Sequence, residues 1–496
     1  MMSVHQQDYY ALLGIMRNAS QEEIRRAYFG AAQKLHPDKN TAAGETEIFL
    51  DIQRAYEVLS NPQRRAQYDA TLPPEERVIL PYEHRLLYSR PNLVRMDEPQ
   101  MLYLILEIQA PAQARQAPAP PLNVCLVLDR STSMQGDKMD TVKSAAIQVL
   151  RNLRAQDILS VVAFSDRAEV IIPASYLQDR QRLEAKIQMI QPSGATEMLQ
   201  GLELGVKEVM RSLDSKRINH IILLTDGHTY GDEQQCLELA SQLGEQGISI
   251  SGMGIGQEWN DIFLDVLSTR TGGSSAYMTQ PQDIKRLLLE KFNALSHTYS
   301  EDITLELKPT EDVELTYAFR IQPDPSPIAL DKSTLHLGSI LQDTATRVIF
   351  EYIIQPKAVK SNSMTFLDGS LRVAIASHPM PVPALQLHLE RPVSDSPEAE
   401  PPPPEIVQAL ARLMLYRMQE RARKEIELGH IDTATRQLQA LASNLLTQGE
   451  RSLAQTILLE VDHLQKKHTL SGEGSKKISY GTRALSYASP NKELLS

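Results

Sequence analysis

The chain has few cysteines, little concentrated positive charge and no long apolar run. Only two of its 496 residues are cysteines, Cys125 and Cys236, so a disulfide framework and a cysteine zinc cluster are both excluded. The formal net charge is -11, and no segment concentrates the Lys and Arg on which phosphate binding depends. The longest apolar runs, such as 101–106 and 221–224, are far too short to span a bilayer. We therefore expect no nucleic-acid partner and no membrane span.

The start of the chain has no basic stretch followed by an apolar core, so it does not resemble a secretory signal. We therefore expect a cytoplasmic location. With 42% hydrophobic and 23% charged residues, the composition is that of an ordinary folded protein. A length of 496 residues exceeds what one hydrophobic core usually supports, which predicts several domains.

Residues 1–72 are predicted to form a small helical domain. Apolar residues recur at helical spacing in two segments, from Ile24 to Leu35 and from Phe49 to Leu59. Pro37 disfavours helical geometry in the residue before it and so ends the first helix. We expect an antiparallel helical hairpin with His36-Pro37-Asp38 at its exposed tip.

This unit resembles the J domain of DnaJ-type co-chaperones over its full length. The resemblance rests on Asp8–Gly14, Glu23–Tyr28, His36–Asn40, Ala55–Pro62 and Arg65–Asp69. It implies that the domain binds a 70-kDa heat-shock chaperone and stimulates its ATP hydrolysis. The residues implied for this contact are the triggering His36, Pro37 and Asp38, with Arg25, Arg26, Lys34 and Lys39 as the positive face. Phe29-Gly30 replaces two residues that are often basic in the family, which implies weaker or more selective docking.

Residues 122–297 are predicted to form a doubly wound α/β domain. Apolar strand candidates at 122–128, 158–164, 220–224 and 248–255 are separated by segments of helix length. Strand-like alternation also occurs on both sides, within 77–121 and 298–392. We therefore expect a β-sandwich built from both flanks, with the α/β domain inserted between them.

The remaining residues divide into three predicted segments. Residues 393–404 are a Pro-rich, semi-rigid linker. Residues 405–466 are helices broken at Gly429 and Gly449, and 467–496, rich in Lys, Ser and Gly, are a mobile tail. The fold class expected for the whole chain is multidomain α+β.

Oxygen-bearing side chains follow two of the α/β strands. The strand at 122–128 runs into Asp129, Ser131 and Ser133, and the strand at 220–224 runs into Asp226. Doubly wound folds build ligand sites at such strand ends, and hydroxyls backed by few carboxylates suit Mg²⁺. Taken singly, Asp129 and Ser133 could instead cap a helix and Asp226 could make a turn.

Together with the loop Ser193–Glu197, these segments resemble the von Willebrand factor A domain with its metal-ion-dependent adhesion site. The resemblance covers about 175 residues. It implies a metal site whose ligands are Asp129, Ser131, Ser133, Thr196 and Asp226. The implied metal is Mg²⁺, with Mn²⁺ or Ca²⁺ as alternatives. In that family the open position on the metal takes an Asp or Glu from a partner protein, so the site recognises rather than catalyses.

We therefore expect a non-enzymatic co-chaperone that recruits a 70-kDa heat-shock chaperone to a client bound through Mg²⁺. Metal-dependent phosphoryl transfer from Asp129 is disfavoured because Ser131 stands where a second aspartate is needed. A second hypothesis is a scaffold or assembly factor for a ring ATPase or a membrane complex, in which the J domain only binds.

Overall fold

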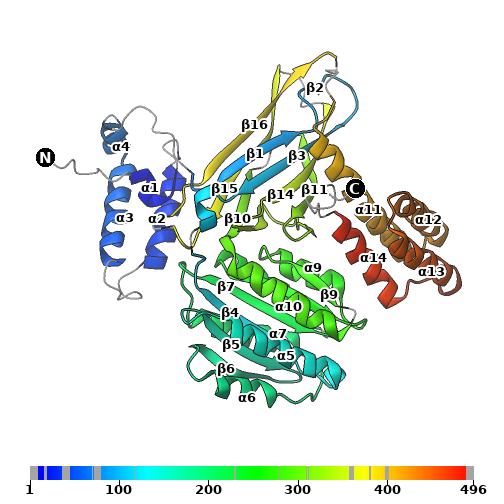
Figure 1. Cartoon of the computed structure of the whole chain (residues 1–496). Helices are drawn as coiled ribbons and strands as arrows, with labels where there is room; N and C mark the ends of the chain where they lie inside the picture. The colour runs from blue at the N-terminus through cyan, green and yellow to red at the C-terminus, as the bar shows by residue number, and fades with distance from the viewer. Residues whose placement is uncertain are drawn as a thin grey trace.

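The computed structural model describes residues 9–15, 19, 21–35, 45–69, 71, 80–116, 118–227, 231–278, 280–308, 310, 312–356, 362–378, 381–396 and 401–486. These residues form four parts (Figure 1). A small helical unit lies beside a β-sandwich, an α/β domain lies at one end of the sandwich, and a C-terminal helical unit contacts both.

The N-terminal unit is held by an apolar seam between its helices. Its helices are α1 (Tyr9–Leu13), α2 (Gln21–Leu35), α3 (Glu45–Leu59) and α4 (Pro62–Asp69). Ile24 of α2 and Ile52 of α3 are buried in this seam, as the helical spacing of the apolar residues predicts. Beside them the rings of Tyr28 and Tyr56 stack with their centroids 4.1 Å apart.

The α/β domain has one six-stranded sheet in the order β6-β5-β4-β7-β8-β9. The strands are β4 (Leu122–Asp129), β5 (Ile158–Phe164), β6 (Ala168–Tyr176), β7 (Ile218–Thr225), β8 (Ser249–Ile255) and β9 (Ser275–Met278). All pairs are parallel except β5 with β6. The helices are α5 (Asp137–Asn152), α6 (Arg180–Gln188), α7 (Met198–Met210), α8 (Glu233–Glu245), α9 (Asp261–Thr269) and α10 (Pro281–Ser296).

Helices cover both faces of this sheet, which explains why β4 is apolar without a break from Val124 to Leu128. Val124 and Leu126 point to the face covered by α5 and α10, whereas Cys125 and Val127 point to the face covered by α7, α8 and α9. Cys125 and Cys236 are both free and buried, so they pack as small apolar side chains.

The β-sandwich is assembled from both sides of the α/β domain. Its strands are β1 (Glu83–Tyr88), β2 (Leu93–Val94), β3 (Gln100–Gln109), β10 (Thr298–Lys308), β11 (Val313–Gln322), β12 (Ser326–Pro327), β13 (Thr334–Leu341), β14 (Thr346–Ile354), β15 (Ser363–Ala374) and β16 (Leu385–Ser394). They form two sheets, in the orders β1-β3-β14-β11-β12 and β13-β10-β15-β16-β2. Because β3 pairs with β14, the α/β domain is inserted in the sandwich, and the predicted fold class is confirmed.

The C-terminal unit consists of α11 (Pro404–Glu427), α12 (Ile431–Thr447), α13 (Arg451–Lys467) and α14 (Gly472–Leu485). Gly429 and Gly449 lie in the two predicted breaks, both with positive φ, the conformation that glycine favours at helix ends. Ile406, Leu413 and Tyr416 of α11 cover the outer face of the sheet that contains β3. Within the described part of the chain, no helix is both long and apolar enough to cross a bilayer.

The prediction of a mobile tail over 467–496 is wrong for residues 472–485. These residues form α14, and Ser471 caps its start by accepting a hydrogen bond from the Gly474 N–H. Ile478 and Thr482 are buried, and Ile478 packs with apolar residues of the other C-terminal helices. The Lys, Ser and Gly content of the segment concealed an amphipathic helix whose polar groups are paired rather than solvated.

Candidate functional site

The candidate site lies where the order in which strands are added to the α/β sheet reverses. From β4 the chain adds β5 and β6 on one side, and it then returns to add β7 and β8 on the other side. The carboxyl ends of β4 and β7 are therefore adjacent, at the point where doubly wound folds bind ligands. Asp129 ends β4, and Asp226 follows the last residue of β7.

Both carboxylates are buried and both accept hydrogen bonds. Asp129 Oδ1 accepts from the Ser131 N–H at 2.8 Å, and Oδ2 accepts from the Thr225 hydroxyl at 2.7 Å. Asp226 Oδ1 accepts from the Ser133 hydroxyl at 2.6 Å. The two acids are thus held in place by their neighbours along the two strands.

The predicted hydroxyl groups surround these carboxylates. Ser131 Oγ lies 3.0 Å from Ser133 Oγ, so the chain of contacts runs from Ser131 through Ser133 to Asp226. Thr196 approaches from the loop before α7, where a Cβ built on Gly227 would lie 3.1 Å from Thr196 Oγ1. The structure therefore brings together all five side chains that the sequence singles out.

Backbone hydrogen bonds hold the loop that carries Thr196 against the loop that follows β4. The Thr132 N–H and hydroxyl both donate to the Gly194 carbonyl, and the Ser193 N–H donates to the Arg130 carbonyl. Gly194 has a φ of +78°, and a Cβ there would lie 2.2 Å from Asp166 Oδ1. Only glycine fits this position, so the loop geometry is set by its sequence.

Two residues that the sequence analysis did not single out complete the site. Thr225 fixes Asp129, and its place directly before Asp226 is the signal that could have found it. Lys138 of α5 donates to Asp226 Oδ2 at 2.5 Å, and no motif indicates this residue. A lysine at the second position of a helix reads as an ordinary surface residue.

The chemistry of the site fits a hard cation. Burial raises the pKa of Asp129, hydrogen bonds from Ser131 and Thr225 lower it, and the nearby charge of Asp226 raises it, with a net upward shift. A divalent cation would offset the cost of holding these two acids together. Among the described residues no group of three or more His, Cys, Asp or Glu could hold a metal, so any metal here depends on hydroxyl ligands.

The residues predicted to contact the chaperone lie on and after α2. Arg25 and Arg26 are exposed on α2, and Arg26 Nη1 lies 3.3 Å from Glu306 Oε1 of β10. Lys34 is also part of α2. The predicted His36, Pro37, Asp38 and Lys39 lie outside the described residues.

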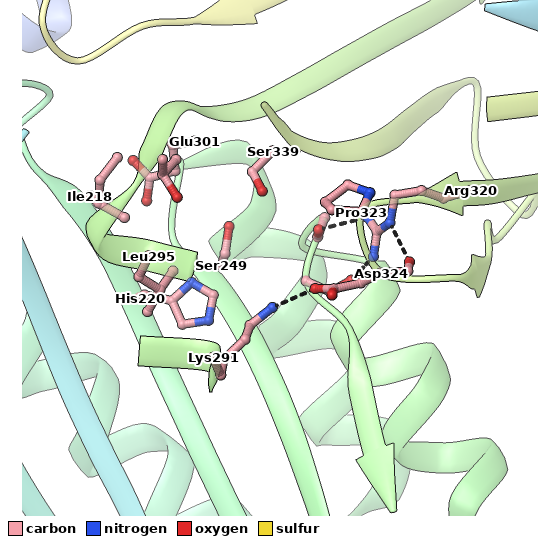
Figure 2. Close-up of a pocket in the computed structure, with 13 residues that line it drawn as sticks. Ile218, His220, Ser249, Lys291, Leu295, Glu301, Arg320, Pro323, Asp324 and Ser339 are labelled. Atoms are coloured by element: carbon pink, nitrogen blue, oxygen red, sulfur yellow. Dashed lines mark hydrogen bonds and ion pairs between the residues drawn. The ribbon is translucent and has the colours of Figure 1, made fainter. Parts of the chain in front are cut away.

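A second polar cluster lies at the amino ends of β7 and β8, where the α/β domain meets the sandwich (Figure 2). Lys291 of α10 donates to Asp324 Oδ2 at 2.9 Å, and Arg320 of β11 donates to the Asp324 carbonyl at 2.9 Å. Burial raises the pKa of Asp324, but the charges of Lys291 and Arg320 outweigh it and hold the pKa well below its usual range. The cavity here is only about 20 Å³, so the cluster joins two domains rather than binding a ligand.

Three family models match the chain. The DnaJ domain matches residues 8–69, and the von Willebrand factor type A domain matches residues 123–292. The chain therefore contains a DnaJ domain and a von Willebrand factor type A domain. The third match is the Sll0103-like, C-terminal alpha-helical domain over 404–487, which includes α14. The first two are called the J domain and the VWA domain below.

The curated relatives match different parts of the chain. Uncharacterized protein sll0103 from Synechocystis is 31% identical over 225 residues, which are 44% of this chain and 52% of that protein. Chaperone protein DnaJ from Rippkaea orientalis is 58% identical over 62 residues, 12% of this chain and 16% of that protein. The chain thus spans about half, or less, of the length of these relatives.

Two solved structures share most of the fold. A von Willebrand factor type A protein from Catenulispora acidiphila has a TM-score of 0.64 at 15% identity, covering 82% of this chain and 98% of that one. The ArnB paralog VWA2 from Sulfolobus acidocaldarius has a TM-score of 0.51 at 16% identity, covering 82% of this chain and 100% of that one. At these identities the likeness concerns the fold alone.

Proposed function

We propose that this chain is a co-chaperone whose J domain stimulates a 70-kDa heat-shock chaperone and whose VWA domain holds a client through a bound Mg²⁺. A J domain supports a co-chaperone role, and a VWA domain supports a binding role. The observation that carries the metal-dependent part is the convergence of Asp129, Ser131, Ser133, Thr196 and Asp226 on one sheet edge.

Ser131, Ser133 and Thr196 would supply hydroxyl oxygens to the metal, and Asp129 and Asp226 would bind it directly or through water. Because three of the five ligands are neutral hydroxyls, the cation would stay electrophilic. It would supply an electrophilic position for an Asp or Glu of the client. The role of the chain's own residues is to hold this oxygen set rigid, which the hydrogen bonds of Asp129 and Gly194 do.

The J domain would act on the chaperone through His36, Pro37 and Asp38, with Arg25, Arg26, Lys34 and Lys39 as the basic face. Because both domains belong to one chain, binding of a client raises the local concentration of chaperone around it. We propose no catalytic step on the chain itself, and a cytoplasmic location stays a prediction.

Stimulation of chaperone ATPase activity tests the first half of the proposal. Single-turnover ATP hydrolysis by the purified 70-kDa chaperone of the same host is measured with the full chain, with His36→Gln and with the control His297→Gln, which changes an exposed histidine between α10 and β10. We expect stimulation by the wild type and the control, and its loss in His36→Gln. Binding without stimulation by the wild type would instead favour the scaffold hypothesis.

Calorimetric titration with Mg²⁺ tests the second half. We expect saturable binding to the wild-type chain and its loss in Ser131→Ala/Ser133→Ala. The matched control is Ser443→Ala/Ser452→Ala, because both serines are exposed on helices of the C-terminal unit. Equal Mg²⁺ affinity in all three proteins would contradict the proposed site.

A further inference from the structure

Lys138 reaches from the surface into the candidate metal site. Its ammonium donates to Asp226 Oδ2 at 2.5 Å and to the Ser133 carbonyl at 3.3 Å. The Asp226 side chain is 0% exposed, whereas the Lys138 side chain is 35% exposed. The partly exposed lysine is therefore paired with a fully buried carboxylate, and that carboxylate is a proposed metal ligand.

The local helix does not explain this placement. Lys138 is the second residue of α5, where the helix dipole disfavours a positive charge. Asp226 supplies the compensating negative charge. On the side of β8, Lys138 Nζ lies near Gly256, where an added Cβ would be 3.9 Å away. The ammonium is thus paired with the buried carboxylate rather than free on the surface.

We propose that Lys138 is an intramolecular competitor for the cation and so sets the metal affinity of the VWA domain. This inference rests on the proposed metal-dependent function. A divalent cation and the ammonium both require the Asp226 carboxylate, and two positive charges at one buried acid repel each other. Metal binding must therefore break or weaken the contact between Lys138 and Asp226.

This competition has a second consequence for the client. Once displaced from Asp226, the ammonium remains tethered to α5 at the edge of the metal site. It is then available to an acidic group, which is the chemistry expected of a ligand for the metal. Lys138 thus weakens binding of the metal alone without weakening the attraction of an acidic partner.

Titration of the full chain with Mg²⁺ as the probe tests the competition. The proteins compared are wild type, Lys138→Gln, Lys138→Arg and Lys207→Gln, in which the last removes the charge of an exposed lysine on α7. We expect Lys138→Gln to lower the Kd by about tenfold, since binding no longer has to break a partly buried ion pair. Lys138→Arg and Lys207→Gln are expected to stay within about threefold of wild type, because each retains a cation beside Asp226.

Thermal unfolding supplies a second readout that detects misfolding. Without metal, Lys138→Gln should melt below wild type because Asp226 loses its partner. The rise in Tm on adding Mg²⁺ should be larger than in wild type, because stabilisation by a ligand grows as its Kd falls. An unchanged or higher Kd for Mg²⁺ in Lys138→Gln would overturn the proposed competition. If Ser131→Ala/Ser133→Ala still abolishes Mg²⁺ binding in the same experiment, the proposed metal site itself stands. No Mg²⁺ binding by any of the proteins would overturn the proposed metal site together with this inference.

Discussion

Arg483 of α14 forms a buried ion pair with Asp265 of α9, with Nη1 2.9 Å from Oδ1. The arginine side chain is 3% exposed and the aspartate side chain is 13% exposed. Tyr480, one turn earlier on α14, packs against Trp259 and Tyr277 of the VWA domain. These contacts fix the C-terminal helix to the VWA domain on the side of β8 and β9.

Removing Arg483 should therefore loosen the whole C-terminal unit. Arg483→Leu removes the charged partner of the largely buried Asp265, and breaking a buried ion pair in this way typically costs about 3–5 kcal/mol. Urea unfolding followed by circular dichroism measures this loss. Arg436→Leu on α12, which changes an exposed arginine, should cost less than about 0.5 kcal/mol. A loss below about 1 kcal/mol in Arg483→Leu would show that α14 does not depend on this pair.

The ion pair of Asp261 with Arg423 should make the stability of the chain sensitive to acid. Arg423 Nη1 lies 2.7 Å from Asp261 Oδ2 and links α11 to α9. Burial raises the pKa of Asp261, but hydrogen bonds and charge from Arg423 outweigh it, and the net pKa is lowered. A lowered pKa contributes stability above the unfolded value of about 3.9, and this stability is lost as the pH falls through the folded value.

We therefore expect Asp261→Asn to be less stable than wild type at pH 7 and to lose less stability between pH 5 and pH 3. Thermal unfolding across this pH range measures both effects. Asp343→Asn, an exposed change in the sandwich, is the control and should follow the wild-type pH profile. Parallel pH profiles for Asp261→Asn and wild type would contradict the assignment.

Gly194 should be essential for the loop that carries Thr196. Gly194→Ala forces a side chain into a φ of +78° and against Asp166, so the loop must move. We expect the Kd for Mg²⁺ to rise by about tenfold or more, as expected for a displaced ligand. Gly247→Ala is the matched control, because its φ is +71° but nothing lies within 4 Å of the added Cβ. Equal Mg²⁺ affinity in Gly194→Ala and Gly247→Ala would contradict a role of this loop in the metal site.

Glu306 should compete with the chaperone for Arg26. The contact is exposed on both sides and contributes at most about 1 kcal/mol, so Glu306→Gln should leave the Tm unchanged. If Arg26 docks the chaperone, the concentration of the chain that gives half-maximal ATPase stimulation should fall by up to about fivefold. Glu314→Gln, an exposed change on β11, serves as the control. A higher half-maximal concentration in Glu306→Gln would mean that the pair supports docking instead.

Much of the fold could be predicted from local patterns. Continuous apolar stretches such as Val124–Leu128 of β4 require cover on both faces, which implies the doubly wound domain. Alternating strands on both flanks predicted the sandwich, and the pairing of β3 with β14 shows that both flanks contribute to it. The five oxygen-bearing residues could be found because each follows a strand or precedes a helix in a fixed order.

The features that could not be predicted from the sequence depend on contacts between distant segments. The ammonium of Lys138 meets Asp226 because β4 and β7 are neighbours, and no local pattern around Lys138 indicates that its side chain turns toward that carboxylate. The helix α14 has a polar composition, and its polar groups find partners such as Asp265 more than 200 residues away in sequence. Sequence patterns show what a segment can bury on its own, but not which distant group will pair with it.

Affinity purification from a lysate of the native host tests most directly whether one chain couples metal-dependent client binding to chaperone recruitment. The tagged full chain, Ser131→Ala/Ser133→Ala and His36→Gln are each used in Mg²⁺ and in EDTA, and bound proteins are quantified by mass spectrometry. We expect the 70-kDa chaperone to be reduced in His36→Gln, and a separate set of proteins to be lost both in the double serine variant and in EDTA. A list of bound proteins that does not change with the metal or the serines would contradict the coupling.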